Sequence, residues 1–361
     1  MLATLPAALA AQTSRSRPKA KQLPSVGEFV RITDPTTETT LVRLTTLKSS
    51  SYLPGAFNRF VSVKERYLLF SSDRNGALAP FQADLRSGLV RQLANPAHLA
   101  AQSLCLDPKE RWLYFLDGDQ LVRTDVTKKE AKRPVPESVA ESVSGFSFGP
   151  GGVIFVVRSG KLQRLEDAGG DDAVLADAVG KICLAQPSSG GQGCLFSREL
   201  SSAEREFWYF SGGSAKPVLL AKGSISYPFW APDGQSVLFL RESVRTDISL
   251  MEIHEVGVDG KSERCIAPTS QFASFAPNFD ASVFVGASRS KAQPNIVLLL
   301  RSAKREMTLC QHHASSAVAV APVFSPDARR VYFQSDEEGK PALYSVNVEL
   351  LVEPAGENTE G

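Results

Sequence analysis

The chain has 361 residues, of which 43% are hydrophobic and 22% are charged, and its formal net charge is +1. Binding to nucleic acid or to an anionic membrane surface needs clustered positive charge, so neither partner is expected. No apolar run reaches the roughly 18 residues that a membrane-spanning helix requires. The composition therefore indicates a globular protein with a sizeable core.

The N-terminal residues resemble an export signal. Residues 2–12 are mostly apolar, and Ala8-Leu9-Ala10 matches a small-residue cleavage site, although a basic segment ahead of it is missing. An apolar N-terminus without a targeting role is the alternative. We expect residues 1–12 to be a possible truncated signal peptide, 13–27 a linker and 351–361 a flexible tail, in a protein exported to the periplasm or secreted.

Between residues 28 and 350 one pattern occurs seven times. A short apolar strand ends at a turn that contains proline, and an aromatic, aliphatic strand follows it. The landmark prolines are Pro108, Pro150, Pro187, Pro232, Pro277 and Pro326, and Val63 takes the place of the first one. Their spacing of about 43 residues is the length of a four-stranded propeller blade.

In chain order, the first expected strand is Thr40–Leu44, which precedes the first repeat and is expected to close the ring. The repeats then follow as FVSVKERYLLFSS (60–72), LCLDPKERWLYFL (104–116), FSFGPGGVIFVV (146–157), LAQPSSGGQGCLFS (184–197), FWAPDGQSVLFL (229–240), FAPNFDASVFVG (275–286) and FSPDARRVYFQS (324–335). A single such sheet cannot bury both of its faces, so the sheets must stack. The prediction is an all-β, seven-bladed β-propeller of four-stranded blades.

Few residues in the chain match a catalytic or metal-binding motif. The five cysteines are scattered without a Cys-x-x-Cys pair, which favours small core residues over a disulfide framework or a zinc site. His254 lies in a strand-like run and His98 in a polar connection, and both are interpreted as structural.

The repeat resembles the TolB-type propeller repeat, and several blades are more specifically similar to oligogalacturonate lyases. The resemblance is carried by the segments Phe70-Ser71-Ser72-Asp73-Arg74-Asn75-Gly76, Phe229-Trp230-Ala231-Pro232-Asp233-Gly234 and Ser335-Asp336-Glu337-Glu338-Gly339-Lys340-Pro341-Ala342-Leu343-Tyr344. It implies a seven-bladed propeller with a manganese-like ion at one mouth of the channel, where pectin fragments are cleaved by β-elimination.

The family's metal ligands are not matched in this chain. The resemblance aligns its histidines and glutamine with Tyr227, Ser316, Ala319 and Ala321, which are poor ligands or none. We therefore expect no metal cofactor, and the apolar run 317–321 is interpreted as an emptied metal loop. A plainer explanation is that Val318 and Val320 are buried strand residues. The alternative is a displaced Mn²⁺ site at Gln311, His312 and His313.

A set of arginines follows the second strand of most blades. Tyr227 and these arginines are the candidate ligand-binding residues, because guanidinium groups bind carboxylates bidentately. Arg205 also aligns weakly with the arginine proposed as the family's base. The other arginines of this set are Arg74, Arg158, Arg198, Arg241, Arg245 and Arg289. The alternative is that the arginines of this set are ordinary solvated turn residues.

These observations favour a lyase-like propeller that binds an acidic oligosaccharide or a partner protein without metal chemistry. Two alternatives stay open. One is an active oligogalacturonate lyase with a rearranged Mn²⁺ site, and the other is a TolB-type protein–protein interaction module.

Overall fold

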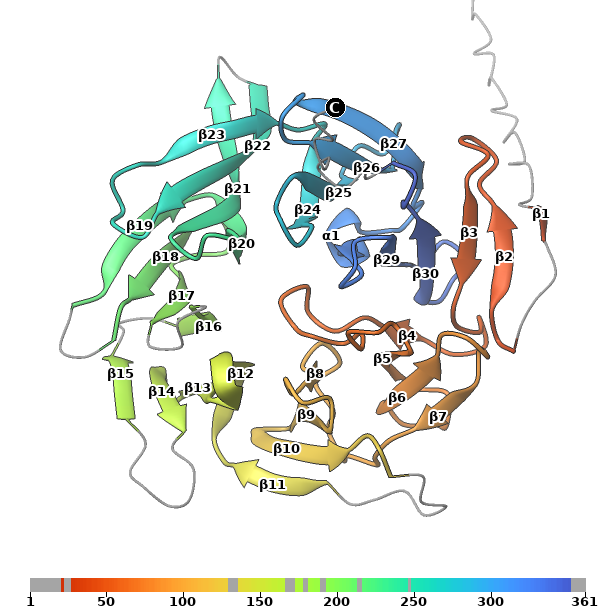
Figure 1. The fold of residues 1–361 in the computed structure, drawn as a ribbon, viewed down its shortest axis with the longest axis horizontal. Coiled ribbons are helices and arrows are strands. Elements are labelled where there is room, and N and C mark those ends of the chain that lie inside the picture. The colour runs from red at the N-terminus through yellow and green to blue at the C-terminus, as the bar shows by residue number, and fades with distance from the viewer. Residues whose placement is uncertain are drawn as a thin grey trace, which may run out of the picture.

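Seven antiparallel β-sheets stand in a ring around a central channel (Figure 1). The computed structural model describes residues 21–22, 27–128, 136–165, 173–177, 181–188, 193–212, 216–245 and 248–351. The expected signal peptide, most of the expected linker and nearly all of the tail lie outside these residues. The arrangement confirms the predicted all-β, seven-bladed β-propeller.

Six blades are built from four strands that are consecutive in the chain and run from the channel outwards. The first three blades are β4 (Ser51–Tyr52), β5 (Tyr67–Ser72), β6 (Ala79–Asp84), β7 (Val90–Gln92); β8 (Cys105–Leu106), β9 (Trp112–Asp117), β10 (Gln120–Asp125), β11 (Glu137–Ala140); and β12 (Val143–Phe148), β13 (Ile154–Arg158), β14 (Lys161–Leu165), β15 (Ala173–Asp177). The next three are β16 (Lys181–Pro187), β17 (Cys194–Glu199), β18 (Arg205–Phe210), β19 (Val218–Gly223); β20 (Ile225–Trp230), β21 (Ser236–Arg245), β22 (Ile248–Gly257), β23 (Arg264–Pro268); and β24 (Phe272–Pro277), β25 (Val283–Ser288), β26 (Asn295–Leu300), β27 (Arg305–Gln311).

The seventh blade joins the two ends of the chain. Its strands β28 (Val323–Phe324), β29 (Arg330–Ser335) and β30 (Ala342–Asn347) are completed by the N-terminal strand β3 (Thr40–Arg43). Leu41 lies opposite Val346 in this antiparallel pair. The predicted ring-closing strand is therefore confirmed. Two further strands, β2 (Val30–Thr33) and β1 (Lys21–Gln22), extend the sheet beyond β3.

Each landmark proline lies at the end of the first strand of its blade or two residues beyond it, as predicted. The acidic residue beside the proline explains the repeated turn. Asp107 accepts hydrogen bonds from the amides of Arg111 and Trp112, both at 2.7 Å, and so closes the turn onto the next strand. Asp233 and Asp327 bind turn amides two residues ahead in the same way.

Stacking of the blades explains the apolar second strands. All six residues of β25 are buried, and so are five of the six in β5. When both faces of a strand pack against neighbouring blades, its sequence is a continuous apolar run and does not alternate between apolar and polar residues. The described residues contain one α-helix, the single turn α1 (Ala317–Val320), and one short 3₁₀ segment, η1 (Pro150–Gly152). Among them, no helix is long and apolar enough to cross a membrane.

Candidate functional site

A cavity of about 920 Å³ lies at the mouth of the central channel. It is lined mainly by the first strands of the blades and by the segments that enter them. Concave sites of this size, built by converging strands, are where propellers and other β-folds bind ligands.

In four neighbouring blades, a β-bulge in the first strand turns one side chain toward this channel. The first strands β12, β16, β20 and β24 each carry an extra residue relative to the second strand, which makes a β-bulge. The residues at the four bulges are Ser144, Cys183, Tyr227 and Ala273, and all of them line the channel. Because a bulge re-aims a side chain and bends its strand, these positions are suited to carry a ligand-binding function.

Tyr227 is held in an unusual backbone conformation at its bulge. Its φ of 53° lies in the left-handed region that a bulky residue rarely adopts. Its hydroxyl donates a hydrogen bond of 3.5 Å to the carbonyl of Val318 on α1. Burial raises the pKa of the Tyr227 phenol, and the nearby Arg205 guanidinium opposes this shift. Tyr227 is therefore a neutral phenol at pH 7, able to donate a hydrogen bond.

The residues aligned with the family's metal ligands meet at this mouth. Tyr227, Ser316, Ala319 and Ala321 all line the channel, although 89 residues separate Tyr227 from Ser316. The run 317–321 is neither an open loop nor a strand. It forms α1, capped by Ala321 in the left-handed conformation, and Val318 is 58% exposed to the channel while Val320 is fully buried. The explanation of Val318 as a buried strand residue is wrong.

The donor set at the channel does not fit manganese. Among the described residues that line it there is no histidine, aspartate or glutamate. The side-chain oxygens there belong to Asn58, Gln102, Gln334, Tyr227 and several serines. Manganese sites rely on carboxylates and imidazoles that converge on one point, and neutral amides and hydroxyls supply no negative charge to balance a divalent cation.

The alternative metal residues lie outside the channel lining. Nε2 of His312 is 2.9 Å from the carbonyl of Ser288, and Nδ1 accepts a hydrogen bond from the amide of Ala314. Oε1 of Gln311 accepts a hydrogen bond from Thr36, and His313 lies 4.0 Å from Glu337. These contacts point the three side chains toward different neighbours.

Of the predicted arginines, Arg205 lines the channel. Its guanidinium is 3.9 Å from Glu199, and about a third of its side chain is exposed. The other arginines with described side chains are not among the lining residues and contact other parts of the protein. Arg74 contacts Glu28, Arg198 contacts Glu206, Arg241 contacts Glu263, Arg289 contacts Glu242, and Arg158 donates to the carbonyl of Glu141. The side chain of Arg245 lies outside the described residues.

An aromatic cluster that sequence reasoning missed crosses the channel. Residues 53–58 leave the first blade after β4 and line the cavity, and Figure 1 shows this segment reaching toward the centre of the ring. The ring of Phe57 lies 4.7 Å from Phe229 and 6.4 Å from Tyr227, both in the fifth blade. The Pro54-Gly55 pair was the available signal, because it ends a strand early and starts a loop.

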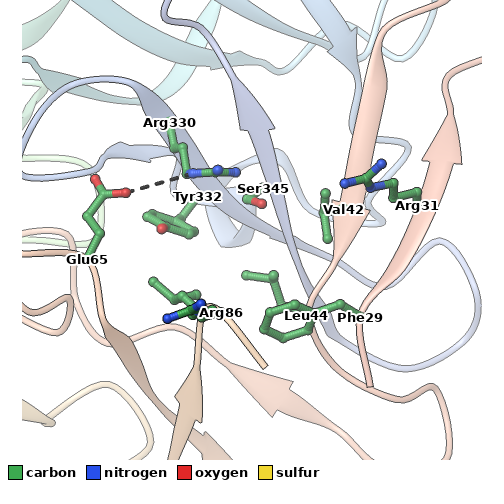
Figure 2. A pocket seen from close by; sticks show the side chains of 10 residues that line it. Phe29, Arg31, Val42, Leu44, Glu65, Arg86, Arg330, Tyr332 and Ser345 are labelled. Atoms are coloured by element: carbon green, nitrogen blue, oxygen red, sulfur yellow. Dashed lines mark ion pairs between the residues drawn. The ribbon is translucent and has the colours of Figure 1, made fainter. Parts of the chain in front are cut away.

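A second cavity of about 280 Å³ lies between the first and seventh blades, near the turn that carries Glu65 and the start of β29 at Arg330 (Figure 2). Oε2 of Glu65 is 3.8 Å from Nε of Arg330. Burial raises the pKa of Glu65 to about 7, and the neighbouring Asp327 shifts it in the same direction. The hydroxyl of Tyr332 is buried beside them without a hydrogen-bond partner.

Comparison with known proteins gives one relative by sequence and several by structure. No family model matches the chain. An oligogalacturonide lyase of Pectobacterium atrosepticum is 26% identical over an alignment of 148 residues, and the match covers 35% of this chain and 37% of that relative's length. This chain is thus similar in sequence to about a third of that lyase.

The structural similarity covers almost the whole chain. The oligogalacturonate lyase of Vibrio parahaemolyticus has a TM-score of 0.76 at 17% identity, over 93% of this chain and 100% of that one. An oligogalacturonate lyase in complex with manganese has a TM-score of 0.75 at 19% identity, over 92% and 98%. The Kuenenia stuttgartiensis hydrazine synthase has a TM-score of 0.59 at 12% identity, over 81% and 95%. The chain therefore has an oligogalacturonate-lyase-like propeller fold, an architecture that also occurs in proteins with other names.

Proposed function

We propose that this lyase-like propeller binds an acidic, uronate-type oligosaccharide at its channel mouth and does not carry out metal-dependent elimination. One observation carries the proposal. The positions aligned with the metal ligands of oligogalacturonate lyases line one cavity, yet they offer a phenol, a hydroxyl and two methyl groups.

The chemistry explains why this donor set matters. β-Elimination of a uronate removes a proton next to a carboxylate, and the dianion that forms must be neutralised. A Lewis acid supplies several kcal/mol of this stabilisation. Arg205 is the cation among the described lining residues, and Tyr227 is a neutral phenol that cannot accept the proton at pH 7. Although Arg205 aligns weakly with the arginine proposed as the family's base, a charged guanidinium and a neutral phenol favour binding over proton abstraction.

The remaining lining groups suit a sugar. Asn58, Gln102 and Gln334 offer amides that can both donate to and accept from hydroxyl groups. The exposed parts of Phe57 and Tyr227 offer aromatic surface beside them. One guanidinium, three amides and two aromatic rings in a single cavity are groups that can bind a short anionic oligosaccharide.

The proposal is tested by calorimetric titration with trigalacturonate. We expect the unaltered protein to bind it, and Arg205→Ala to weaken the affinity at least about tenfold, since a charge-assisted hydrogen bond contributes about 1.5–3 kcal/mol. Arg289→Ala is the matched control and should bind normally, because Arg289 contacts Glu242 away from the channel. Binding that is unaffected by Arg205→Ala, or absent from the unaltered protein, contradicts the proposal.

The same preparation distinguishes the two alternatives. An active lyase with a rearranged site would release unsaturated product from trigalacturonate on addition of Mn²⁺, and His312→Ala or His313→Ala would abolish this activity. A protein–protein module would show neither saccharide binding nor product. We expect saccharide binding without product.

A further inference from the structure

A group of possible metal ligands lies outside the channel lining, on the outer strands of the fifth blade. Glu252 and His254 are two residues apart on β22, so their side chains point to the same face of the sheet. Cys265 on β23 pairs directly with His254. One ligand atom from each of these residues lies within 4.8 Å of those of the other two. Figure 1 shows β23 at the outer edge of this blade.

We propose that Glu252, His254 and Cys265 form a zinc site that joins β22 to β23. Zinc accepts this mixture of carboxylate, imidazole and thiolate ligands, and sites with three protein ligands keep a fourth position for water. The proposal does not depend on the function of the channel.

The distance between two of the ligands fits a tetrahedral ion. Nε2 of His254 is 3.3 Å from Oε2 of Glu252. With zinc bonds of 2.0–2.2 Å, two ligand atoms of a tetrahedral site lie about 3.3–3.5 Å apart. Cys265 is exposed, so its side chain can rotate to complete the site.

A complete outer shell holds the histidine in the orientation that a metal requires. Nδ1 of His254 lies 2.7 Å from Oε1 of Glu263. Glu263 is itself held by a bidentate ion pair with Arg241, at 2.7 and 2.8 Å. Metal-ligating histidines generally donate their second ring N–H to a carboxylate in this way. On the other side, Ser243 donates a hydrogen bond of 2.7 Å to Oε2 of Glu252.

This arrangement suits a metal ion between His254 and Glu252. When Nδ1–H donates to Glu263, Nε2 of a neutral ring presents a lone pair toward the carboxylate of Glu252, which repels it. A metal ion bound to both atoms removes this repulsion. Zn²⁺ would balance the charges of Glu252 and a Cys265 thiolate, while Arg241 balances Glu263. The thiol of Cys265 beside this gap supplies the third ligand.

Cobalt titration of the chelator-treated full chain tests the proposal. We expect one equivalent of Co²⁺ to give a thiolate-to-cobalt charge-transfer band that Zn²⁺ then displaces. Cys265→Ser should abolish the band. Cys183→Ser, the matched control at the other exposed cysteine, should leave it unchanged. Glu263→Gln should keep the band but weaken the affinity about 10- to 100-fold.

The outcomes that overturn the proposal are distinct. Absence of a saturable thiolate band in the unaltered protein would show that these three residues do not bind a metal. A band that survives Cys265→Ser, or that disappears with Cys183→Ser, would place the bound metal elsewhere. A thermal shift supplies a second readout. Zn²⁺ should raise the melting temperature of the unaltered protein and of Cys183→Ser but not of Cys265→Ser.

Discussion

Glu65 shows how a single buried carboxyl can make the stability of the ring depend on pH. It lies in the turn ahead of β5 and faces Arg330 and Tyr332 of the last blade (Figure 2). Its side chain is 17% exposed, and burial is the main reason that its pKa rises to about 7. Asp327 and Ser325 of the last blade also contact this group, and the pKa of Asp327 is lowered to about 2.

The unaltered protein is expected to lose folding stability as the pH rises from about 4.5 to about 7. The first prediction is that Glu65→Gln abolishes this loss. The folded protein keeps the Glu65 proton up to about pH 7, whereas the unfolded chain loses it near 4.5. The folded state therefore binds more protons between these values, and its stability falls as the pH rises through them. The shift corresponds to about 3 kcal/mol at most.

Urea unfolding at pH 5 and pH 8 measures this effect. From pH 5 to pH 8, the unfolding free energy of the unaltered protein should fall by about 2–3 kcal/mol more than that of Glu65→Gln. Asp327 binds its proton only well below pH 5, because its pKa is lowered to about 2, so it does not contribute to this difference. Glu204→Gln, at an exposed glutamate, is the control and should behave as the unaltered protein does. Equal pH dependence in all three proteins would exclude the raised pKa.

At the scale of single elements, the crossing segment 53–58 ties the first blade to the fifth. Phe57 packs its ring against Phe229 and, more distantly, Tyr227. Contacts between opposite blades cannot form in a ring unless one segment enters the channel. This segment therefore shapes the candidate site and contributes to the core at once, since Phe229 also packs against the main core cluster.

The second prediction is that Phe57→Ala destabilises the protein by about 1–3 kcal/mol, because it removes half-buried aromatic surface and a ring–ring contact. Phe57→Leu should cost less, since it keeps most of the apolar contact. Phe279→Ala is the matched control, because Phe279 is 69% exposed, and its change should stay within about 0.5 kcal/mol. If Phe57→Ala and Phe279→Ala unfold at the same urea concentration, the segment does not pack across the channel.

The strands could be predicted from the sequence to a greater extent than the site. Each turn is local, because Asp107, Asp233 and Asp327 bind amides a few residues away, and local chemistry is visible in a repeat. By contrast, α1 is four residues long and ends at Ala321 without the glycine that marks most left-handed caps. The apolar run 317–321 thus carried no helix signal.

The arginines also show that the sequence predicted positions better than contacts. Their positions after the second strands were visible in the sequence, but their partners were not. Glu263 lies 22 residues from Arg241, and Glu28 lies 46 residues from Arg74. Cys265 was expected in the core and is exposed, because strand alternation on an outermost strand does not show which face meets a neighbouring blade. Cys183 is exposed for a different reason, since a bulge turns it toward the channel.

At the scale of the whole molecule, the ring is held by the pairing of its two ends. Without β3, strand β30 would become an open edge and the seventh blade would have three strands. Such an edge pairs readily with other chains. The closing segment also brings Leu41 and Leu44 into the core, at 7% and 3% exposure, and Leu44 donates a 2.7 Å hydrogen bond to the carbonyl of Leu343.

The last prediction compares two N-terminal deletions. Removal of residues 1–44 should destabilise the protein by at least about 3–6 kcal/mol, the value of burying Leu41 and Leu44 alone, and should promote aggregation through β30. Removal of residues 1–26 is the control. It spares β2 and β3, so the unfolding midpoint should change little, because β1 adds two residues at the far edge of the sheet. Urea unfolding and light scattering measure both effects. If the two truncated proteins unfold together and stay monomeric, closure by β3 does not hold the ring, and the stacking of the blades alone must do so.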